Sequence, residues 1–173
     1  DSLHKTEDLK IRVYGMISNN EENLAYYLDK GITQTDKLTI RSVKVYADGA
    51  LGSRGAALKK PYSDAKNNTG LFLTTPEEIE RLAYLLAEKG FQMNTHAIGD
   101  AANQVVLDAY EKALAISPDP RWRVEHAQVV EKQDLEKFGP KVIHYVQPTH
   151  ASSDMECADE RLGEERVQTA YTF

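Results

Sequence analysis

The chain has 173 residues, 41% hydrophobic and 28% charged, with a net charge of −6. This balance is typical of a globular protein, no stretch approaches the roughly 20 apolar residues of a membrane span, and no overall basic character favours nucleic acid. The single cysteine, Cys157, excludes an intramolecular disulfide framework and a multi-cysteine zinc cluster. We therefore expect one cytoplasmic domain over residues 1–173, with neither a nucleic acid nor a membrane as its partner.

The first part of the sequence alternates strand-like and helical patterns. Ile11 to Ile17 is apolar and β-branched at alternate positions, as in a strand. A helix is predicted from Glu21 to Lys30, because Asn20 is a good N-cap and Gly31 is a helix stop. Val43 to Ala47 is the next predicted strand.

A long irregular segment follows at 48–74. Loops of this length are uncommon inside compact domains and are usually functional or mobile. The glycines of this segment form neither a dinucleotide-binding fingerprint nor a P-loop. Thr75 then begins a helix as its N-cap, with Pro76 as the first residue and Glu78 as the acid of a capping box. Gly90 ends that helix.

The second half of the sequence repeats this alternation. Asp100 is the expected N-cap of a helix that Pro118 and Pro120 end. The other predicted elements are strands at 91–95, 121–125 and 142–146 and helices at 134–138 and 159–171. Connections of this length between strands imply parallel pairing with right-handed crossovers. The pattern predicts an α/β fold, either a doubly wound sheet or a (β/α) barrel.

Two histidines stand where predicted strands end. His96 follows the strand at 91–95, and His126 follows the strand at 121–125. Functional sites form at this end of the sheet in parallel α/β folds. Imidazole nitrogens from neighbouring strands can converge there on one zinc, iron, cobalt or nickel ion. The alternative is that each is a buried histidine bonded to loop backbone, and the residues alone leave both open.

Lys44 lies inside a predicted strand, between two valines. Alternation places it on one face of the sheet with Ser42 and Tyr46, and in a barrel one face is the packed interior. A buried ammonium is costly, and desolvation lowers its pKa. A neutral amine can add carbon dioxide to form a carbamate, which is an oxygen donor for metals. The alternative is a lysine on an edge strand that reaches water.

Other polar residues are weaker candidates. Asp48 and Asp100 follow strand ends and are candidates for substrate binding, although cap preferences favour Asp100 as a helix N-cap. Glu125 precedes His126 and is expected to point to the opposite face in a structural role. His144 lies inside a strand, where we expect it to be packed or hydrogen-bonded.

Several segments occur in a specific order along residues 11–173. They are VKVYADG, GALGSRGAAL, PYSD, HAIGDAANQVVLDAYEKAL, RVEHAQ, VQPTH and ADERLGEER. In this order they resemble the amidohydrolase superfamily, and within it the amidohydrolase family 3 group of YtcJ-like metal-dependent hydrolases. No single short motif is decisive, whereas the ordered set is specific.

This resemblance implies a (β/α)₈ barrel with one or two divalent metal ions, expected to be zinc. It implies that Lys44 matches the carboxylated lysine on the fourth barrel strand, and that His96 and His126 match the histidine ligands on the fifth and sixth. It also implies that His150 faces the substrate region. The implied reaction is C–N hydrolysis of an amide or a cyclic amide by metal-activated water.

The sequence departs from the family pattern in two places. The family carries His-x-His or His-x-Asp on its first strand, and no two of the five histidines here are spaced as His-x-His. The chain also ends at Phe173, before any eighth strand and its catalytic Asp. A barrel of this type takes roughly 250 residues. We therefore expect a partial TIM-like (β/α) barrel of about five parallel strands, strands 3 to 7 of eight, with flanking helices.

An incomplete site is the consequence of these departures. We expect no catalytic residue within this fragment, weak or partial metal occupancy at Lys44, His96 and His126, and no turnover. The open barrel edges predict a homo-oligomer or other self-association. The alternative is a non-catalytic α/β module that binds a ligand or a metal.

Overall fold

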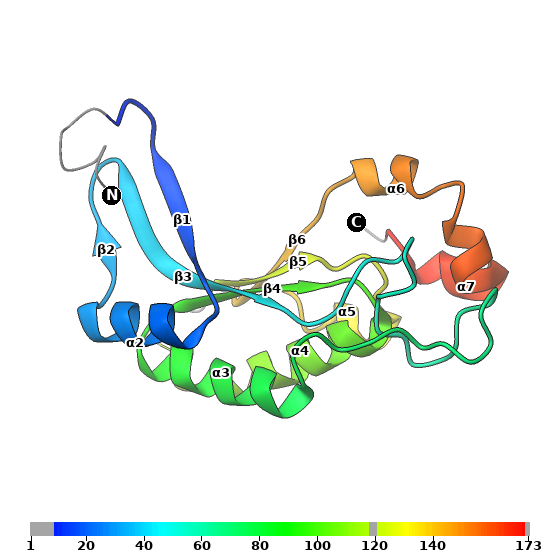
Figure 1. Cartoon of the computed structure of the whole chain (residues 1–173), viewed down its shortest axis with the longest axis horizontal. Helices are drawn as coiled ribbons and strands as arrows, with labels where there is room; N and C mark the ends of the chain where they lie inside the picture. The colour runs from blue at the N-terminus through cyan, green and yellow to red at the C-terminus, as the bar shows by residue number, and fades with distance from the viewer. Residues whose placement is uncertain (1–8, 118–120, 172–173) are drawn as a thin grey trace.

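The computed structural model describes residues 9–117 and 121–171 (Figure 1). Its strands are β1 (Val13–Ser18), β2 (Thr33–Gln34), β3 (Leu38–Tyr46), β4 (Gln92–Ala97), β5 (Trp122–His126) and β6 (Val142–Tyr145). Its helices are α2 (Glu21–Lys30), α3 (Pro76–Glu88), α4 (Asp100–Ala113), α5 (Lys132–Leu135), α6 (Thr149–Ser153) and α7 (Ala158–Arg166), followed by the 3-10 helix η1 (Val167–Thr169). In this described part of the chain, no helix has the length and apolar character that crossing a membrane requires.

Five parallel strands form the sheet, in the order β1-β3-β4-β5-β6. This confirms the predicted parallel α/β fold. The two-residue strand β2 pairs antiparallel with β3 and was not predicted, because so short a strand shows no periodic pattern. β3 begins at Leu38 rather than at Val43, since the residues before Val43 already pair with β1 and β2.

Helices α3 and α4 cover one face of the sheet, and Figure 1 shows them beneath the strands. Alternate strand residues point toward these helices and are fully buried: Val43, Val45, Met93, Trp122 and Val124. Burying one such side chain contributes roughly 1.5–3 kcal/mol. This layer therefore fixes the positions of the strand ends that carry the histidines.

The predicted helix starts are confirmed where local capping sets them. The Thr75 hydroxyl accepts a hydrogen bond from the backbone N–H of Glu78 at 3.3 Å, at the start of α3. The side chain of Asn20 caps α2, and Gly31 follows its last residue with φ 81°. Glycine reaches this left-handed region without the steric cost of a side chain, which explains why the helix ends there.

The start of α4 differs from the prediction. Its N-cap is Gly99, and Asp100 is the first helical residue rather than the cap. A Cβ at position 99 would lie 1.9 Å from the carbonyl oxygen of Ala57, so only glycine fits against this loop. The expected stops of this helix, Pro118 and Pro120, lie outside the described residues.

The last part of the chain is also more broken than predicted. The expected helix at 159–171 is kinked at Gly163, which has φ 78°, and its α-helical part ends at Arg166, after which only the short η1 follows. Helix α6 was not predicted, and α5 covers Lys132–Leu135 in place of the expected 134–138. These short helices carry too few residues for a clear helical periodicity.

The second face of the sheet is concave and bears the polar strand residues. Arg123 on β5 reaches β1, where its Nη2 lies 3.4 Å from Met16 Sδ and its guanidinium lies 5.7 Å from the centre of the Tyr14 ring. Three spacings of about 4.8 Å separate these strands along the sheet, so a flat sheet would hold them about 14 Å apart. The contact therefore fits a sheet that curves toward this face, as in the expected partial TIM-like barrel.

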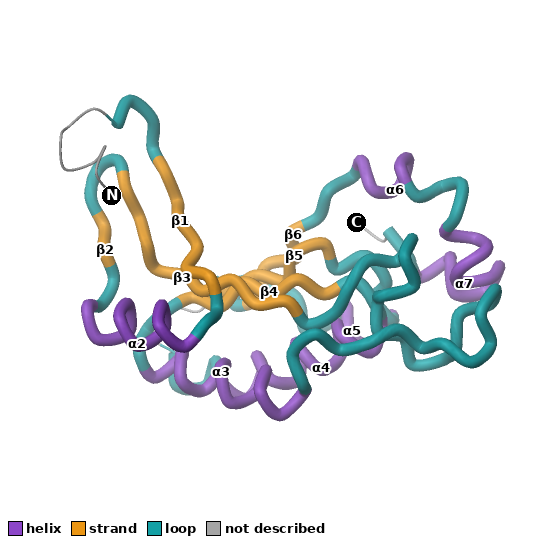
Figure 2. Tube along the Cα trace, in the orientation of Figure 1, coloured by secondary structure: helices purple, strands orange, loops and turns teal. Residues whose placement is uncertain are grey.

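The loop at 48–74 is packed rather than loose. Figure 2 shows this long loop running beside α7. Tyr62 is 1% exposed and shares a hydrophobic cluster with Leu162 of α7. The carboxylate of Asp64 accepts a hydrogen bond from Arg161 of the same helix. Helix α7 thus holds the loop that follows β3.

Candidate functional site

His96 and His126 lie side by side at the C-terminal ends of β4 and β5. The two strands pair in parallel, with Ala97 opposite His126. The centres of the two imidazole rings are 4.8 Å apart, with an angle of 70° between their planes. The structure therefore brings together the two histidines that the sequence singled out as metal ligands.

The backbone of His126 is strained, with φ 77°. This left-handed region is rare for residues with a side chain, and holding one there costs about 1–3 kcal/mol. The turn reverses the strand alternation at this position, which allows His126 and its neighbour Glu125 to face the same side. Strain of this kind often occurs at functional sites.

Each imidazole has one ring nitrogen facing an oxygen acceptor. His126 Nδ1 lies 2.6 Å from Oε1 of Gln147, and His96 Nε2 lies 3.4 Å from the carbonyl oxygen of Gly49. Because both partner atoms accept hydrogen bonds, these two nitrogens carry the protons. The lone pairs are then on His126 Nε2 and His96 Nδ1. Metal-binding histidines usually have this arrangement, in which the other ring N–H is held by an acceptor.

Burial keeps both rings uncharged at neutral pH. It lowers the pKa of His96 to about 4, and protonation of the neighbouring His126 would lower it further. The pKa of His126 is also lowered, first by burial and also by Lys44, although its bond to Gln147 opposes this. The Asp48 carboxylate is 3.6 Å from His96 Nε2, but this is not an ion pair at neutral pH because His96 is neutral. Neutral imidazole is the form that binds metals.

Lys44 lies on the neighbouring strand β3, on the same concave face. It pairs with Asn94, two positions before Tyr46, which pairs with His96. Its Nζ lies 4.8 Å from the centre of the Tyr46 ring. The pKa of Lys44 is lowered, first by burial, while the nearby carboxylate of Glu125 opposes the shift. This favours the neutral amine, which is the form that can bind a metal or add carbon dioxide.

The donor set fits a divalent metal only if Lys44 takes part. Within residues 9–117 and 121–171, no three His, Cys, Asp or Glu side chains are placed to hold an ion together. His96 and His126 supply two neutral imidazoles, and Lys44 supplies one further donor from the next strand. Three protein ligands is the number found in open zinc sites. The residues present are therefore chemically suited to zinc.

His150 lies next to this pair. It belongs to α6, and its ring stacks on that of His126, with 5.2 Å between the centres and 18° between the planes. The three rings of His96, His126 and His150 thus form a row. His150 therefore lies beside the candidate metal ligands, and its substrate-facing role stays a prediction.

Asp48 and Asp100, the two carboxylates predicted to bind substrate, both accept hydrogen bonds from the backbone. The Asp48 carboxylate is fully buried and accepts hydrogen bonds from the N–H groups of Ala57, Ile98 and Gly99 at 2.8–2.9 Å. Burial raises the pKa of Asp48 to about 6. Asp100 Oδ1 accepts from the backbone of Lys59 at 2.9 Å and of Ala101 at 3.0 Å. Both carboxylates thus hold the 48–74 loop against the start of α4, and their role in substrate binding stays a prediction.

The sequence reasoning misplaced one residue and missed another. Glu125 lies on the concave face rather than on the opposite one, because it shares a register row with Tyr46 and His96. It is 7% exposed and forms an ion pair with Arg123, with 2.8 Å between Oε1 and Nε. Gln147 was not singled out, and no local pattern marks it, since its partner His126 is far away in sequence. His144 bonds the carbonyl oxygen of Ala127 at 3.3 Å, as its predicted packed role requires.

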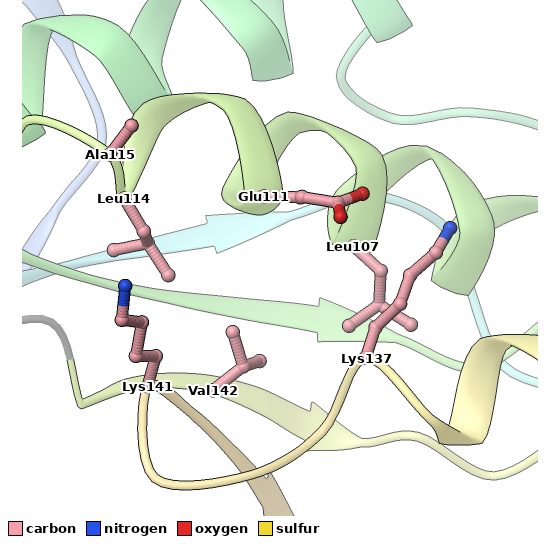
Figure 3. Close-up of a pocket in the computed structure, with 7 residues that line it drawn as sticks. All are labelled: Leu107, Glu111, Leu114, Ala115, Lys137, Lys141 and Val142. Atoms are coloured by element: carbon pink, nitrogen blue, oxygen red, sulfur yellow. The ribbon is translucent and has the colours of Figure 1, made fainter.

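Two hollows in the structure lie at different places relative to the histidines of the candidate site. One, of about 280 Å³, includes Lys44 and Tyr46 in its wall. The other, of about 240 Å³, is drawn in Figure 3 and lies between α4 and the segment that leads into β6. Its walls are Leu107, Glu111, Leu114, Ala115, Lys137, Lys141 and Val142. Neither wall includes a histidine, but the first hollow includes Tyr46, whose ring centre is 5.7 Å from that of His96. The first hollow is therefore adjacent to the candidate site.

The chain is similar to several known proteins. Residues 2–173 match the model of the Amidohydrolase family, Amidohydro_3. Protein LONG AFTER FAR-RED 3 of Arabidopsis thaliana is 37% identical over 150 residues, which cover 84% of this chain and 26% of that protein. YtcJ, a candidate amidohydrolase of Bacillus subtilis (strain 168), is 37% identical over 136 residues, which cover 76% of this chain and 25% of that protein.

Two solved structures are similar to the whole described fold. The first, an uncharacterized metal-dependent hydrolase from Pyrococcus furiosus, has a TM-score of 0.86 and 33% identity, covering 98% of this chain and 35% of that chain. The second, an uncharacterized metal-dependent hydrolase from Pyrococcus horikoshii OT3, has a TM-score of 0.83 and 36% identity, covering 98% of this chain and 34% of that chain. This chain therefore spans about a quarter of the length of the curated relatives and about a third of the solved chains.

Proposed function

Because this chain belongs to the amidohydrolase family, we propose that its concave face supplies part of a divalent metal centre that hydrolyses C–N bonds of amides or cyclic amides. The observation that carries the proposal is the pair of neutral imidazoles at the ends of adjacent parallel strands, with ring centres 4.8 Å apart. Each ring has one nitrogen held by an internal acceptor and the other left with a lone pair.

The metal is zinc, and His96, His126 and Lys44 hold it. A bound zinc ion supplies a Lewis acid that polarises a carbonyl group and lowers the pKa of water. The chain's own residues prepare this site. Burial keeps both histidines neutral, Gln147 fixes which nitrogen of His126 is protonated, and Lys44 serves as an amine or, after carboxylation, as an oxygen donor.

Hydrolysis also needs a group that accepts and returns a proton near the carbonyl carbon. The Asp48 carboxylate lies 3.6 Å from His96 Nε2, but three backbone N–H groups already bind it. Glu125 is bound to Arg123 by an ion pair. We therefore propose that this polypeptide on its own binds zinc without hydrolysing amides.

A non-catalytic binding module is the second candidate. It is favoured by the absence, within the described residues, of any three His, Cys, Asp or Glu side chains that could hold an ion together. In that case the His96 and His126 loops bind a small molecule directly. Metal binding separates the two candidates, because only the hydrolase requires it.

Zinc titration by calorimetry at pH 7.5 is the test. We expect one site per chain, and a loss of affinity of at least about tenfold in His96→Ala and in His126→Ala, since each removes a ligand. His144→Ala is the matched control, because His144 lies on β6, bonds Ala127 and stacks on Phe138 instead of on the other histidines. Equal affinity in all four proteins contradicts the proposal.

An activity assay on the same samples tests whether the chain on its own hydrolyses amides. We expect no hydrolysis of a panel of amides and cyclic amides above the rate with free zinc. Turnover that disappears in His126→Ala would show that the chain alone is a complete catalyst. Neither zinc binding nor turnover would favour the binding module.

A further inference from the structure

A hollow of about 280 Å³ opens beside Lys44, at the C-terminal ends of β1 and β3. Besides Lys44, its walls are Ser18, Asn19, Tyr46, Leu73 and Thr74. The backbone fixes these walls in place. The N–H of Leu73 donates to Ala47 at 2.8 Å, and the hydroxyl of Thr74 donates to the carbonyl oxygen of Tyr46 at 2.8 Å.

Two large apolar side chains on these walls are exposed. Tyr46 is 53% exposed and Leu73 is 59% exposed, although both stand beside the buried strand end. The ring of Tyr46 also has a defined position relative to the candidate ligands. Its centre is 4.8 Å from Lys44 Nζ and 5.7 Å from the centre of the His96 ring. Tyr46 and Leu73 are thus the apolar part of a wall whose other residues are polar. Small-molecule sites also combine apolar contacts with placed polar groups.

A polar group with unused hydrogen bonds completes the hollow. Asn19 follows β1 and is partly buried, and its side-chain amide bonds none of the described residues. A carboxamide offers both donors and an acceptor, so it can bind another amide group. The face of an aromatic ring such as Tyr46 favours stacking against a second planar ring.

From this combination we infer that Tyr46 and Leu73 form a subsite for the planar ring of an aromatic amide, with Asn19 binding the amide group. The inference rests on the proposed hydrolase function, because it names the substrate class of the same site. It places the ring on Tyr46 and leaves the amide close to Lys44 and His96.

Binding of benzamide to the metal-free chain tests this subsite. Chemical-shift titration in ¹H–¹⁵N spectra follows the Asn19 side chain and the Leu73 amide directly. Cyclohexanecarboxamide is the matched probe, because it has the same amide and the same number of ring carbons without a planar ring. We expect saturable shifts at these two residues, and affinity for benzamide about threefold or more above that for cyclohexanecarboxamide, as ring stacking predicts.

Variants of Tyr46 separate the contribution of its ring to benzamide binding from general effects on the fold. Tyr46→Ala is expected to weaken benzamide binding about tenfold, whereas Tyr46→Phe retains it, because the ring supplies the contact. Tyr46 is more than half exposed, so truncation leaves the core intact, and the spectrum of the free variant reports its fold. Tyr145→Ala is the control, since Tyr145 lies in the same register row on β6 and is 45% exposed.

The inference is overturned if benzamide produces no saturable shifts, if Tyr46→Ala binds it as tightly as the parent chain, or if Tyr145→Ala weakens it equally. Failure of the proposed function has a different signature. Benzamide binding that persists in His126→Ala and is lost in Tyr46→Ala supports the subsite, while a failed zinc titration counts against the metal centre alone.

Discussion

Gln147 orients His126, and replacing it tests whether this contact prepares the ring for a metal. Gln147 Oε1 is 2.6 Å from His126 Nδ1, and Gln147→Leu removes this acceptor at nearly constant size. A hydrogen bond contributes about 0.5–1.5 kcal/mol net, which corresponds to about 2–13-fold in affinity. Groups that hold metal-binding histidines typically change metal affinity about 10–100-fold. Since the two ranges overlap near tenfold, we expect zinc affinity to fall about tenfold.

Calorimetric zinc titration at pH 7.5 measures this change, and ¹⁵N spectra of the imidazole measure its cause. We expect Nδ1 of His126 to be protonated in the parent chain and the two forms to mix in Gln147→Leu. Gln133→Leu is the control, because Gln133 is exposed on α5 and bonds Glu131. Unchanged zinc affinity in Gln147→Leu, or a proton on Nε2 of the parent chain, would refute the reasoning.

Three other predictions concern acid stability, capping and association. Unfolded His96 takes up a proton near pH 6.5, but in the folded chain burial lowers its pKa to about 4, so folding weakens as the pH falls through this range. In urea unfolding, the free energy of unfolding should fall less with acid in His96→Gln than in the parent chain. The raised pKa of Asp48 has the opposite effect, but it is common to both chains and cancels in this comparison. Identical pH slopes of the two chains would contradict the prediction. Thr75→Ala removes the cap of α3 and should lower the free energy of unfolding by about 1 kcal/mol in the same assay, whereas no change would show that the cap contributes nothing. The open edges and concave face should cause self-association, which sedimentation velocity detects, and a stable monomer at high concentration contradicts it.

Local signals made much of the fold predictable. Thr75 and Pro76 start a helix through contacts within its first turn, so the sequence alone identifies α3. The start of α4 depends instead on a contact between Gly99 and Ala57, which are distant in sequence, and cap preference therefore selected Asp100 wrongly. The two-residue strand β2 exists only through its pairing with β3, which no periodic pattern reveals.

The candidate site, like the fold, was predictable from the sequence only where local signals mark its residues. His96 and His126 were recognisable because they stand at strand ends, and the register of β4 and β5 then brings them together. Glu125 was placed on the wrong face because strict alternation assumes a regular backbone, and the positive φ of His126 breaks that regularity. The contact of Gln147 with His126 depends on how β5 and the segment after β6 meet in space.

Anomalous diffraction at the zinc edge, from crystals of the chain soaked in zinc, tests the central claim most directly. The account predicts a zinc peak bound to His96 Nδ1 and His126 Nε2 at about 2.0–2.1 Å, with Lys44 or its carbamate as the third protein ligand. A zinc peak at other residues, or none while both imidazoles keep their places, would contradict the account.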